Sequence, residues 1–266
     1  MVNIQKAAVI GCGFVGSTIA YTLMQKGLFS EMVLLDANKA KAEGEAMDIS
    51  HGLPFTHAMD IYAGEYEDIA DASVVIITAG ANQKPGETRL DLVQKNAAIM
   101  RSIIKEIKRV NCEGILLIVS NPVDILTEVA LRESGFPKER VIGSGTVLDT
   151  ARLKYIISEK LDVDSRNVHA FIVGEHGDSE LAAWSCANIY GIKLQDFAKM
   201  RGYEHFAQDM EEVYKGVRDS AYEIIERKGA TYYGTGMAAE KIVEAIVRNS
   251  HSDDCRKRRG GTGAGD

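Results

Sequence analysis

Short apolar runs alternate with longer segments of helical periodicity through the first half of the chain. The runs that predict buried strands cover residues 7–10, 32–35, 74–78, 115–119 and 141–142, with a plausible edge strand at 59–63. The segments that repeat apolar side chains every three to four residues predict helices over 15–26, 39–50, 88–110 and 123–133. Strands that alternate with helices favour a parallel sheet with right-handed crossovers. The sequence therefore predicts an α/β fold with a doubly wound parallel sheet over residues 1–143.

The second half of the chain has a less regular pattern. Apolar stretches at 168–173 and 181–189 predict strands, and helical patterns cover 203–227 and about 231–248. These elements predict a mixed α+β domain over residues 144–249. Residues 250–266 show neither apolar periodicity nor β-alternation, so we expect them to be unstructured.

Composition and charge are those of an ordinary globular protein. The chain has 266 residues, of which 45% are hydrophobic, and a net charge of −7, so a sizeable core is expected and a nucleic-acid surface is not. It has no apolar run long enough to span a membrane and no signal peptide at its start, so we expect a cytoplasmic protein. Cys12, Cys112, Cys186 and Cys255 form no C-x-x-C pair, which favours reduced thiols and no metal site.

A glycine-rich segment follows the first predicted strand. Gly11, Gly13 and Gly16 form a G-x-G-x-x-G motif that opens a helix, as a dinucleotide pyrophosphate requires. Asp36 ends the second strand, twenty residues after Gly16, where a carboxylate binds ribose hydroxyls and repels a 2′-phosphate. The alternative is that Asp36 caps the helix near Asn38. Context and spacing together predict a Rossmann domain that binds NAD rather than NADP.

Further polar or small residues follow the other strands. Gly80, Asn121 and Ser144 fall at strand ends, where ligands bind in open parallel sheets. The polar segment 81–87 contains glycine and proline and is a candidate lid. Arg89 follows it, and either serves the site or is a surface charge.

A histidine between two glycines, His176, follows the apolar run 168–173. Histidine is the side chain that most readily exchanges a proton near neutral pH. Upstream, Asp149 and Arg152 are three residues apart and share one face if their segment is helical. An acid, a base and an anion clamp suit a small carboxylate substrate with a reducible carbonyl, although an isolated histidine is more often a loop residue bonded to backbone.

Five motifs occur in a fixed order along the chain. They lie at residues 11–16, 79–89 (AGANQKPGETR), 120–122 (SNP), 148–152 (LDTAR) and 174–178 (GEHGD). Through them the chain resembles the bacterial lactate dehydrogenases of the lactate/malate dehydrogenase family, from the N-terminus to about residue 249. The resemblance implies a cytoplasmic homotetramer that reversibly transfers hydride between NADH and pyruvate, giving (S)-lactate in fermentation.

The resemblance also implies roles for single residues. His176 would exchange a proton with the substrate carbonyl, Asp149 would orient His176, and Arg152 would bind the substrate carboxylate. Arg89 would polarise the carbonyl when the lid closes. Further substrate contacts are implied at Gln83, Asn121, Asp124 and Thr231, and cofactor contacts at Gly11, Gly13, Val15, Gly16, Asp36, Lys41, Tyr66, Gly80, Ala81, Ser102, Val119, Asn121 and Ser144.

Two alternatives and one effector site stay open. Malate enzymes of the family typically have arginine at the position of the neutral Gln83, so we expect pyruvate to be preferred over oxaloacetate, with malate or another 2-hydroxy acid as the alternative. A non-catalytic NAD-binding protein is the other alternative. Lys154 and His169 match positions that bind fructose 1,6-bisphosphate in relatives, or else are surface residues of a helix and a strand.

The chain departs from the family pattern in two places. Thr235 stands where the family more often has a bulky apolar residue against the nicotinamide. From residue 250 the family pattern stops, so the substrate domain is expected to be incomplete at its C-terminus. We expect low stability and little turnover from such a domain, because absent strands leave an unpaired sheet edge.

Overall fold

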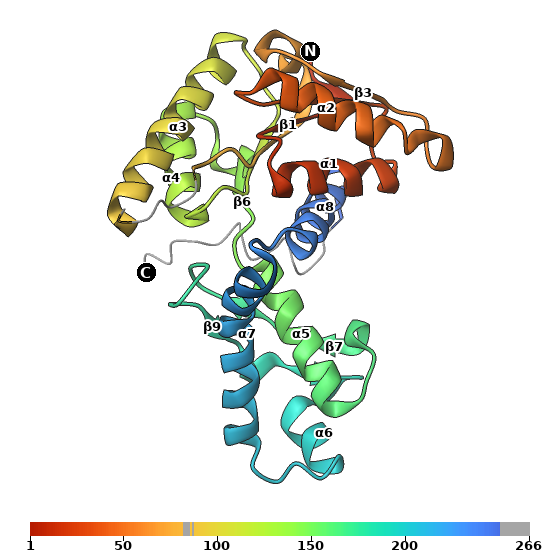
Figure 1. Ribbon diagram of the computed structural model, residues 1–266. Helices are drawn as coiled ribbons and strands as arrows, with labels where there is room; N and C mark the ends of the chain where they lie inside the picture. Colours follow the sequence, from red (N-terminus) through yellow and green to blue (C-terminus); the bar gives the residue numbers. More distant parts are fainter. Residues whose placement is uncertain (82–85, 87, 251–266) are drawn as a thin grey trace. The chain divides into compact units, whose positions relative to one another are not determined.

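The chain folds into two compact units in the computed structural model, which describes residues 1–81, 86 and 88–250 (Figure 1). The first unit contains residues 1–144 and the returning helix α8 (Tyr233–Val247), and the second contains residues 145–231. Two polypeptide connections therefore join the units.

A six-stranded sheet of order β3-β2-β1-β4-β5-β6 forms the centre of the first unit. All its strand pairs are parallel, and the central register places Val9 of β1 beside Leu34 of β2 and Ile76 of β4. The strands are β1 (Asn3–Ile10), β2 (Glu31–Leu35), β3 (Asp60–Ala63), β4 (Ala72–Ile77), β5 (Ile115–Ile118) and β6 (Val141–Gly143). The predicted α/β class with a doubly wound parallel sheet is confirmed.

Helices cover both faces of this sheet. Strand order reverses between β1 and β4, so right-handed crossovers place the helices before and after that point on opposite faces. Figure 1 shows α3 and α4 together on one side and α1 and α2 on the other. The helices are α1 (Phe14–Lys26), α2 (Lys39–Ser50), α3 (Arg89–Arg109) and α4 (Val123–Ser134), with short 3-10 turns η1 (Leu53–Phe55), η2 (Tyr66–Ile69) and η3 (Lys138–Arg140).

The core of the first unit follows from the strand alternation. Ile10, Ile77 and Ile118 turn one face of the sheet toward Met100 and Leu126 of α3 and α4, and all of them are buried. The apolar runs are continuous because both faces of a parallel sheet are covered.

Helix α8 packs on α1. Thr18 of α1 lies so close to Gly236 that a Cβ there would come within 2.5 Å of the threonine Cγ2. Lys26 of α1 adds ion pairs of 3.6 Å to Glu240 and 3.2 Å to Glu244. The sequence division at residues 143 and 144 therefore differs from the division by contacts, because this helix returns to the first unit.

The second unit packs two helices against short strands. Leu153 and Ile157 of α5 (Val147–Leu161) meet Val213 and Val217 of α7 (Phe206–Lys228) in its core. One sheet has the order β11-β10-β7 and the other pairs β8 with β9. The remaining elements are η4 (Ser165–Asn167), β7 (Val168–His169), β8 (Ile172–Val173), β9 (Leu181–Ala182), η5 (Trp184–Cys186), β10 (Asn188–Ile189), β11 (Ile192–Lys193) and α6 (Leu194–Met200).

The strands of the second unit differ from the prediction. The apolar run 168–173 is split into β7 and β8, which belong to different sheets, and the stretch 181–189 is interrupted by η5. Each piece is two residues long because the chain changes its pairing partner. Between β10 and β11, Tyr190 (φ 53°) and Gly191 (φ 80°) both have positive φ, as a tight two-residue hairpin requires.

Candidate active site

The glycine turn after β1 is tied to the end of β2. The Gly11 N–H donates to the Leu35 carbonyl at 2.7 Å, and the Cys12 N–H donates to Asp36 Oδ2 at 2.7 Å. Asn38 caps α2 by accepting the Lys41 N–H, so Asp36 is not the helix cap. The carboxylate of Asp36 is held at the carboxyl edge of the sheet beside the turn.

The glycine turn also has the shape that a dinucleotide needs. Gly11 has a φ of 103°, and a Cβ on Gly16 would lie 1.8 Å from the Gly11 carbonyl oxygen. A Cβ on Gly13 would meet no atom within 4 Å, so open space lies beside that backbone. Gly13 is the N-cap of α1 and provides no side-chain cap. Uncapped amides that face open space fit a pyrophosphate.

Asn96 joins two loops of the first unit and was missed by the sequence reasoning. Its Nδ2 donates to the Asn121 carbonyl at 2.9 Å and to the Ala81 carbonyl at 3.3 Å, while its Oδ1 accepts the Ala81 N–H at 2.8 Å. The side chain is buried on the same face of α3 as Met100 and Ile103. A polar residue at an apolar helical position was the signal that could have identified it.

The other candidate residues of the first unit lie at or near the strand ends. Gly80 follows β4, Val119 follows β5, and the Ser144 N–H donates to the Ile118 carbonyl at 2.7 Å. Arg89 and Asp124 are exposed in the first turns of α3 and α4. Val15 and Tyr66 are half-buried, Lys41 and Ser102 are exposed on helices, and Gln83 lies outside the described residues.

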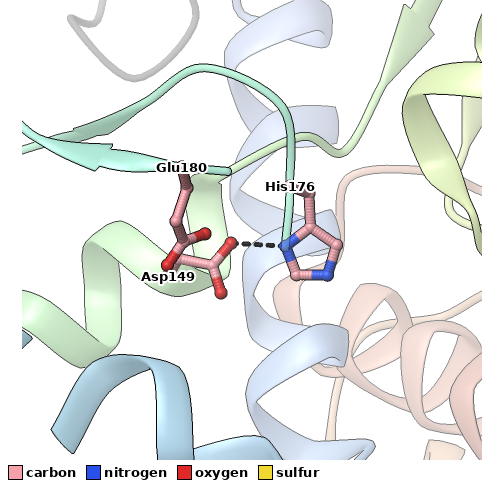
Figure 2. A group of neighbouring side chains, drawn as sticks. All are labelled: Asp149, His176 and Glu180. Atoms are coloured by element: carbon pink, nitrogen blue, oxygen red, sulfur yellow. Dashed lines mark hydrogen bonds and ion pairs between the residues drawn. The ribbon is translucent and has the colours of Figure 1, made fainter. Parts of the chain in front are cut away.

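A cluster of four polar side chains forms in the second unit, and Figure 2 shows three of them, Asp149, His176 and Glu180. Asp149 and Arg152 share one face of α5, and the Arg152 Nη1 donates to Asp149 Oδ1 at 2.9 Å. The other carboxylate oxygen, Oδ2, lies 2.6 Å from His176 Nδ1. This bond leaves Nε2 as the ring nitrogen that can exchange a proton with a ligand, and the His176 side chain is 28% exposed.

A β-hairpin carries His176. Strands β8 and β9 pair antiparallel with Val173 opposite Leu181, and the intervening loop contains Gly174 (φ 100°) and Gly177 (φ 122°). The hairpin is attached to α5 because Thr150 Oγ1 accepts the Ile172 N–H at 3.0 Å. Helix and hairpin therefore bring Asp149 and His176 together from positions far apart in the sequence.

The charges of the cluster favour a protonated histidine. The hydrogen bond to Asp149 raises the pKa of His176, although burial opposes this. Burial also acts to raise the pKa of Asp149, but the hydrogen bond and charge of His176 and the charge of Arg152 outweigh it and lower that pKa. The pair can hold an imidazolium beside a carboxylate and release the proton through Nε2.

Glu180 completes the cluster and was not singled out from the sequence. It directly precedes β9 and is only 3% exposed. Single ligand atoms of Asp149, His176 and Glu180 lie within 4.8 Å of one another, close enough for a metal ion to be shared. Burial and the nearby charge of Asp149 raise the pKa of Glu180 to about 7.

The remaining candidates of the second unit lie outside this cluster of side chains. The Lys154 Nζ is 5.5 Å from the centroid of the Phe171 ring. His169 is exposed on β7, where it pairs with Asn188 of β10. Thr231, the last residue of the second unit, is half-buried. Thr235 is half-buried in α8, which belongs to the first unit. No helix among the described residues is long and apolar enough to cross a membrane.

Comparison with known families matches nearly the whole chain. Residues 5–143 match the model of the NAD-binding domain of lactate/malate dehydrogenases. Residues 146–255 match the model of the α/β C-terminal domain of the same family.

Individual relatives agree with these matches. An L-lactate dehydrogenase of Acetivibrio thermocellus is 56% identical over 249 residues, which cover 94% of this chain and 78% of the relative. An L-lactate dehydrogenase of Priestia megaterium is 54% identical over 248 residues, which cover 93% of this chain and 78% of the relative. The crystal structure of a lactate dehydrogenase from a Medee basin deep-sea metagenome library superposes with a TM-score of 0.91 at 52% identity, covering 95% of this chain and 80% of that one.

Proposed function

Because the chain belongs to the lactate/malate dehydrogenase family, we propose that it interconverts pyruvate and (S)-lactate as an NAD-dependent L-lactate dehydrogenase. The observation that carries the proposal is the 2.6 Å bond between Asp149 and His176, with Arg152 on the same helical face as the aspartate. In this arrangement His176 can donate a proton, and Arg152 can bind the carboxylate of a substrate.

The cofactor is NAD, and when bound it supplies or accepts the hydride. Gly13 leaves room at the uncapped start of α1, where backbone amides would bind the pyrophosphate. Asp36 would bind the ribose hydroxyls. Around these residues, Gly11, Val15, Gly16, Lys41, Tyr66, Gly80, Ala81, Ser102, Val119, Asn121 and Ser144 would complete the cofactor site.

His176 is the proton donor in the direction of pyruvate reduction. The Asp149 carboxylate fixes the proton of Nδ1 and stabilises the imidazolium, so that Nε2–H can donate to the carbonyl oxygen. In lactate oxidation the neutral ring accepts the proton at the same atom. The guanidinium of Arg152 would bind the substrate carboxylate through two parallel hydrogen bonds, which its planar shape favours.

The family resemblance gives substrate-binding roles to further residues. Arg89 would polarise the carbonyl, and Asn121 and Asp124 would contact the substrate together with Thr231 and Gln83. The hydrogen bonds of Asn96 support the role of Asn121, because they hold its backbone in one place.

The test compares the unchanged chain with His176→Gln. We expect NADH-dependent reduction of pyruvate, a kcat/KM for oxaloacetate at least about tenfold lower, and a loss of about 100-fold or more in the variant, because general acid catalysis contributes roughly 100- to 10,000-fold. A buried second carboxylate would need a cation, and Gln83 supplies none. Equal kcat/KM for the two oxo acids would refute the choice of pyruvate, and undiminished turnover by His176→Gln would refute the mechanism.

Assembly and regulation follow as further proposals. A cytoplasmic homotetramer regulated by fructose 1,6-bisphosphate would place Lys154 and His169 at a subunit interface. The exposure of His169 supports such a site. A pyruvate saturation curve that does not move with millimolar sugar bisphosphate would refute the effector, and a monomeric mass in sedimentation would refute the tetramer.

A further inference from the structure

The proposed mechanism leaves one buried carboxyl group beside its centre unused. Glu180 Oε2 accepts no hydrogen bond from the described residues, although the residue is only 3% exposed. Figure 2 shows this carboxyl group next to that of Asp149, on the side away from His176. Two ionised carboxylates in such contact repel each other, so the arrangement favours a proton on one of them. Asp149 is the less favourable place for this proton, because its Oδ2 already bonds to His176 and its Oδ1 accepts from Arg152.

The main chain around Glu180 fixes the place of this side chain. Its N–H donates to the Gly177 carbonyl at 3.1 Å, and its own carbonyl accepts the hydroxyl of Tyr214 from α7. The residue also lies at the neck of the hairpin, where its Cα is 3.7 Å from the position of a Cβ on Gly174. These contacts hold the main chain of Glu180 at the point from which its carboxyl group reaches that of Asp149 (Figure 2).

Charged and titratable groups face Glu180 from each neighbouring element. Helix α5 contributes Asp149, which also bonds to Arg152, the hairpin contributes His176, and α7 contributes Tyr214. Arg218 of α7 lies 4.9 Å from the centroid of the Tyr214 ring. On its own loop, Glu175 and Asp178 are exposed and screened by water. The ionisable neighbours that act electrostatically on Glu180 are therefore Asp149 and His176.

We propose that Glu180 is a positioning residue that acts on His176 through Asp149. In its protonated form, the Glu180 hydroxyl donates to the Asp149 carboxylate and holds it in line with Nδ1 of His176. In its ionised form, Glu180 adds a second negative charge that keeps the proton on His176. This role rests on the proposed function of His176. Because ionised Glu180 keeps the proton on His176, pyruvate reduction continues to higher pH.

The experiment replaces Glu180 with Gln, which retains a donor but cannot ionise. The titration of the His176 imidazole is followed by proton NMR in the full chain, with its signal assigned by loss in His176→Gln. We expect the His176 pKa to fall by about one unit in Glu180→Gln, because the ionised carboxylate is lost. One unit is a tenfold decrease in the proton affinity of the imidazole. The fall in kcat/KM for pyruvate with rising pH should move by the same amount, while kcat near pH 6 stays within about twofold.

The matched control is Glu240→Gln on α8. Glu240 Oε1 is likewise buried without a hydrogen-bond partner among the described residues, although Lys26 forms an ion pair with it at 3.6 Å, and Glu240 belongs to the first unit. This control should leave the His176 titration unchanged. Glu180→Leu, which lacks both donor and charge, should lower kcat near pH 6 more than Glu180→Gln does. Chelator is present throughout, so that a divalent cation bound by the cluster cannot produce the effect.

Three results would overturn the inference. They are an unmoved His176 titration in Glu180→Gln, an equal shift in Glu240→Gln, and equal losses of kcat near pH 6 in the Gln and Leu variants of Glu180. The titration does not require turnover. A chain that shows the shift but reduces no pyruvate would refute the proposed function alone, whereas turnover without the shift would refute this inference alone.

Discussion

Replacing Asp149 with Asn separates the charge of this side chain from its shape. The amide oxygen can still accept the Nδ1–H of His176, so the orientation of the ring is retained. The variant loses the negative charge of Asp149 Oδ2, which lies 2.6 Å from Nδ1 in the unchanged chain. Arg152, which donates to Asp149 at 2.9 Å, then becomes an uncompensated cation near the imidazole. Both changes disfavour the protonated form of His176.

The size of the effect follows from the strength of the lost interaction. A hydrogen bond to a charged group is stronger than a neutral one by about 1 kcal/mol, which sets the lower bound. Two unit charges about 4 Å apart at an effective dielectric constant of about 20 interact by about 4 kcal/mol, which sets the upper bound. The His176 pKa should therefore fall by about 1 to 3 units.

The assay is the pH profile of kcat/KM for pyruvate reduction. Above the His176 pKa of the unchanged chain, the variant should lose about 10- to 1,000-fold, because fewer molecules hold the proton that is transferred. Below the lowered pKa of the variant, the loss should be much smaller. Asp164→Asn is the matched control, since Asp164 also accepts from an arginine, Arg166, but at an exposed position. It should leave the profile unchanged.

A uniform loss at every pH, with the midpoint unmoved, would refute this reasoning. Such a result would mean that Asp149 acts through ring orientation alone. A profile identical to that of the unchanged chain would remove Asp149 from the mechanism.

Three further changes test other parts of the molecule. Gly13→Val should leave the melting temperature unchanged but weaken NADH binding, measured by fluorescence titration, about tenfold or more, because a side chain there meets open space and not protein. Arg152→Lys should raise the KM for pyruvate about tenfold or more in steady-state kinetics, because an ammonium lacks the planar fork. Glu180→Leu should stabilise the chain relative to its parent at about pH 8 but not at about pH 5, by up to about 3 kcal/mol in denaturant unfolding. The folded-state pKa of Glu180 is raised to about 7, so in the parent stability falls as pH rises from the ordinary carboxyl pKa to that value.

The sheet of the first unit could be predicted because its signals are local. Each strand is a continuous apolar run, and the glycine motif stands where strand and helix meet. The two-residue strands of the second unit could not be predicted, because their extent is set by pairing with distant partners such as β7 with β10. For the same reason, the packing of α8 on α1 through Gly236 has no local signal.

The site, like the fold, could be predicted only where its signals are local in the sequence. Helical spacing places Asp149 and Arg152 on one face of α5, but His176 is 27 residues from Asp149 and was joined to it by family resemblance. Glu180 looks like an ordinary loop acid in the sequence. It is buried where the hairpin loop meets β9 and where the Tyr214 hydroxyl donates to its carbonyl, and neither contact has a local signal in the sequence. Asn96 was detectable in principle as a polar residue in an apolar stripe.

The ladder of the His176 hairpin contains only two residue pairs, Ile172 with Ala182 and Val173 with Leu181. A ribbon of that length has little stability of its own. Its attachment to α5 is at Ile172, whose N–H donates to Thr150 Oγ1 and whose carbonyl accepts the Thr146 hydroxyl at 2.8 Å. Both threonines lie at the start of α5, on either side of Asp149. Amide hydrogen exchange at Ile172 should therefore follow the opening of α5, and an opened molecule would lose the proton donor and its carboxylate partner in one step.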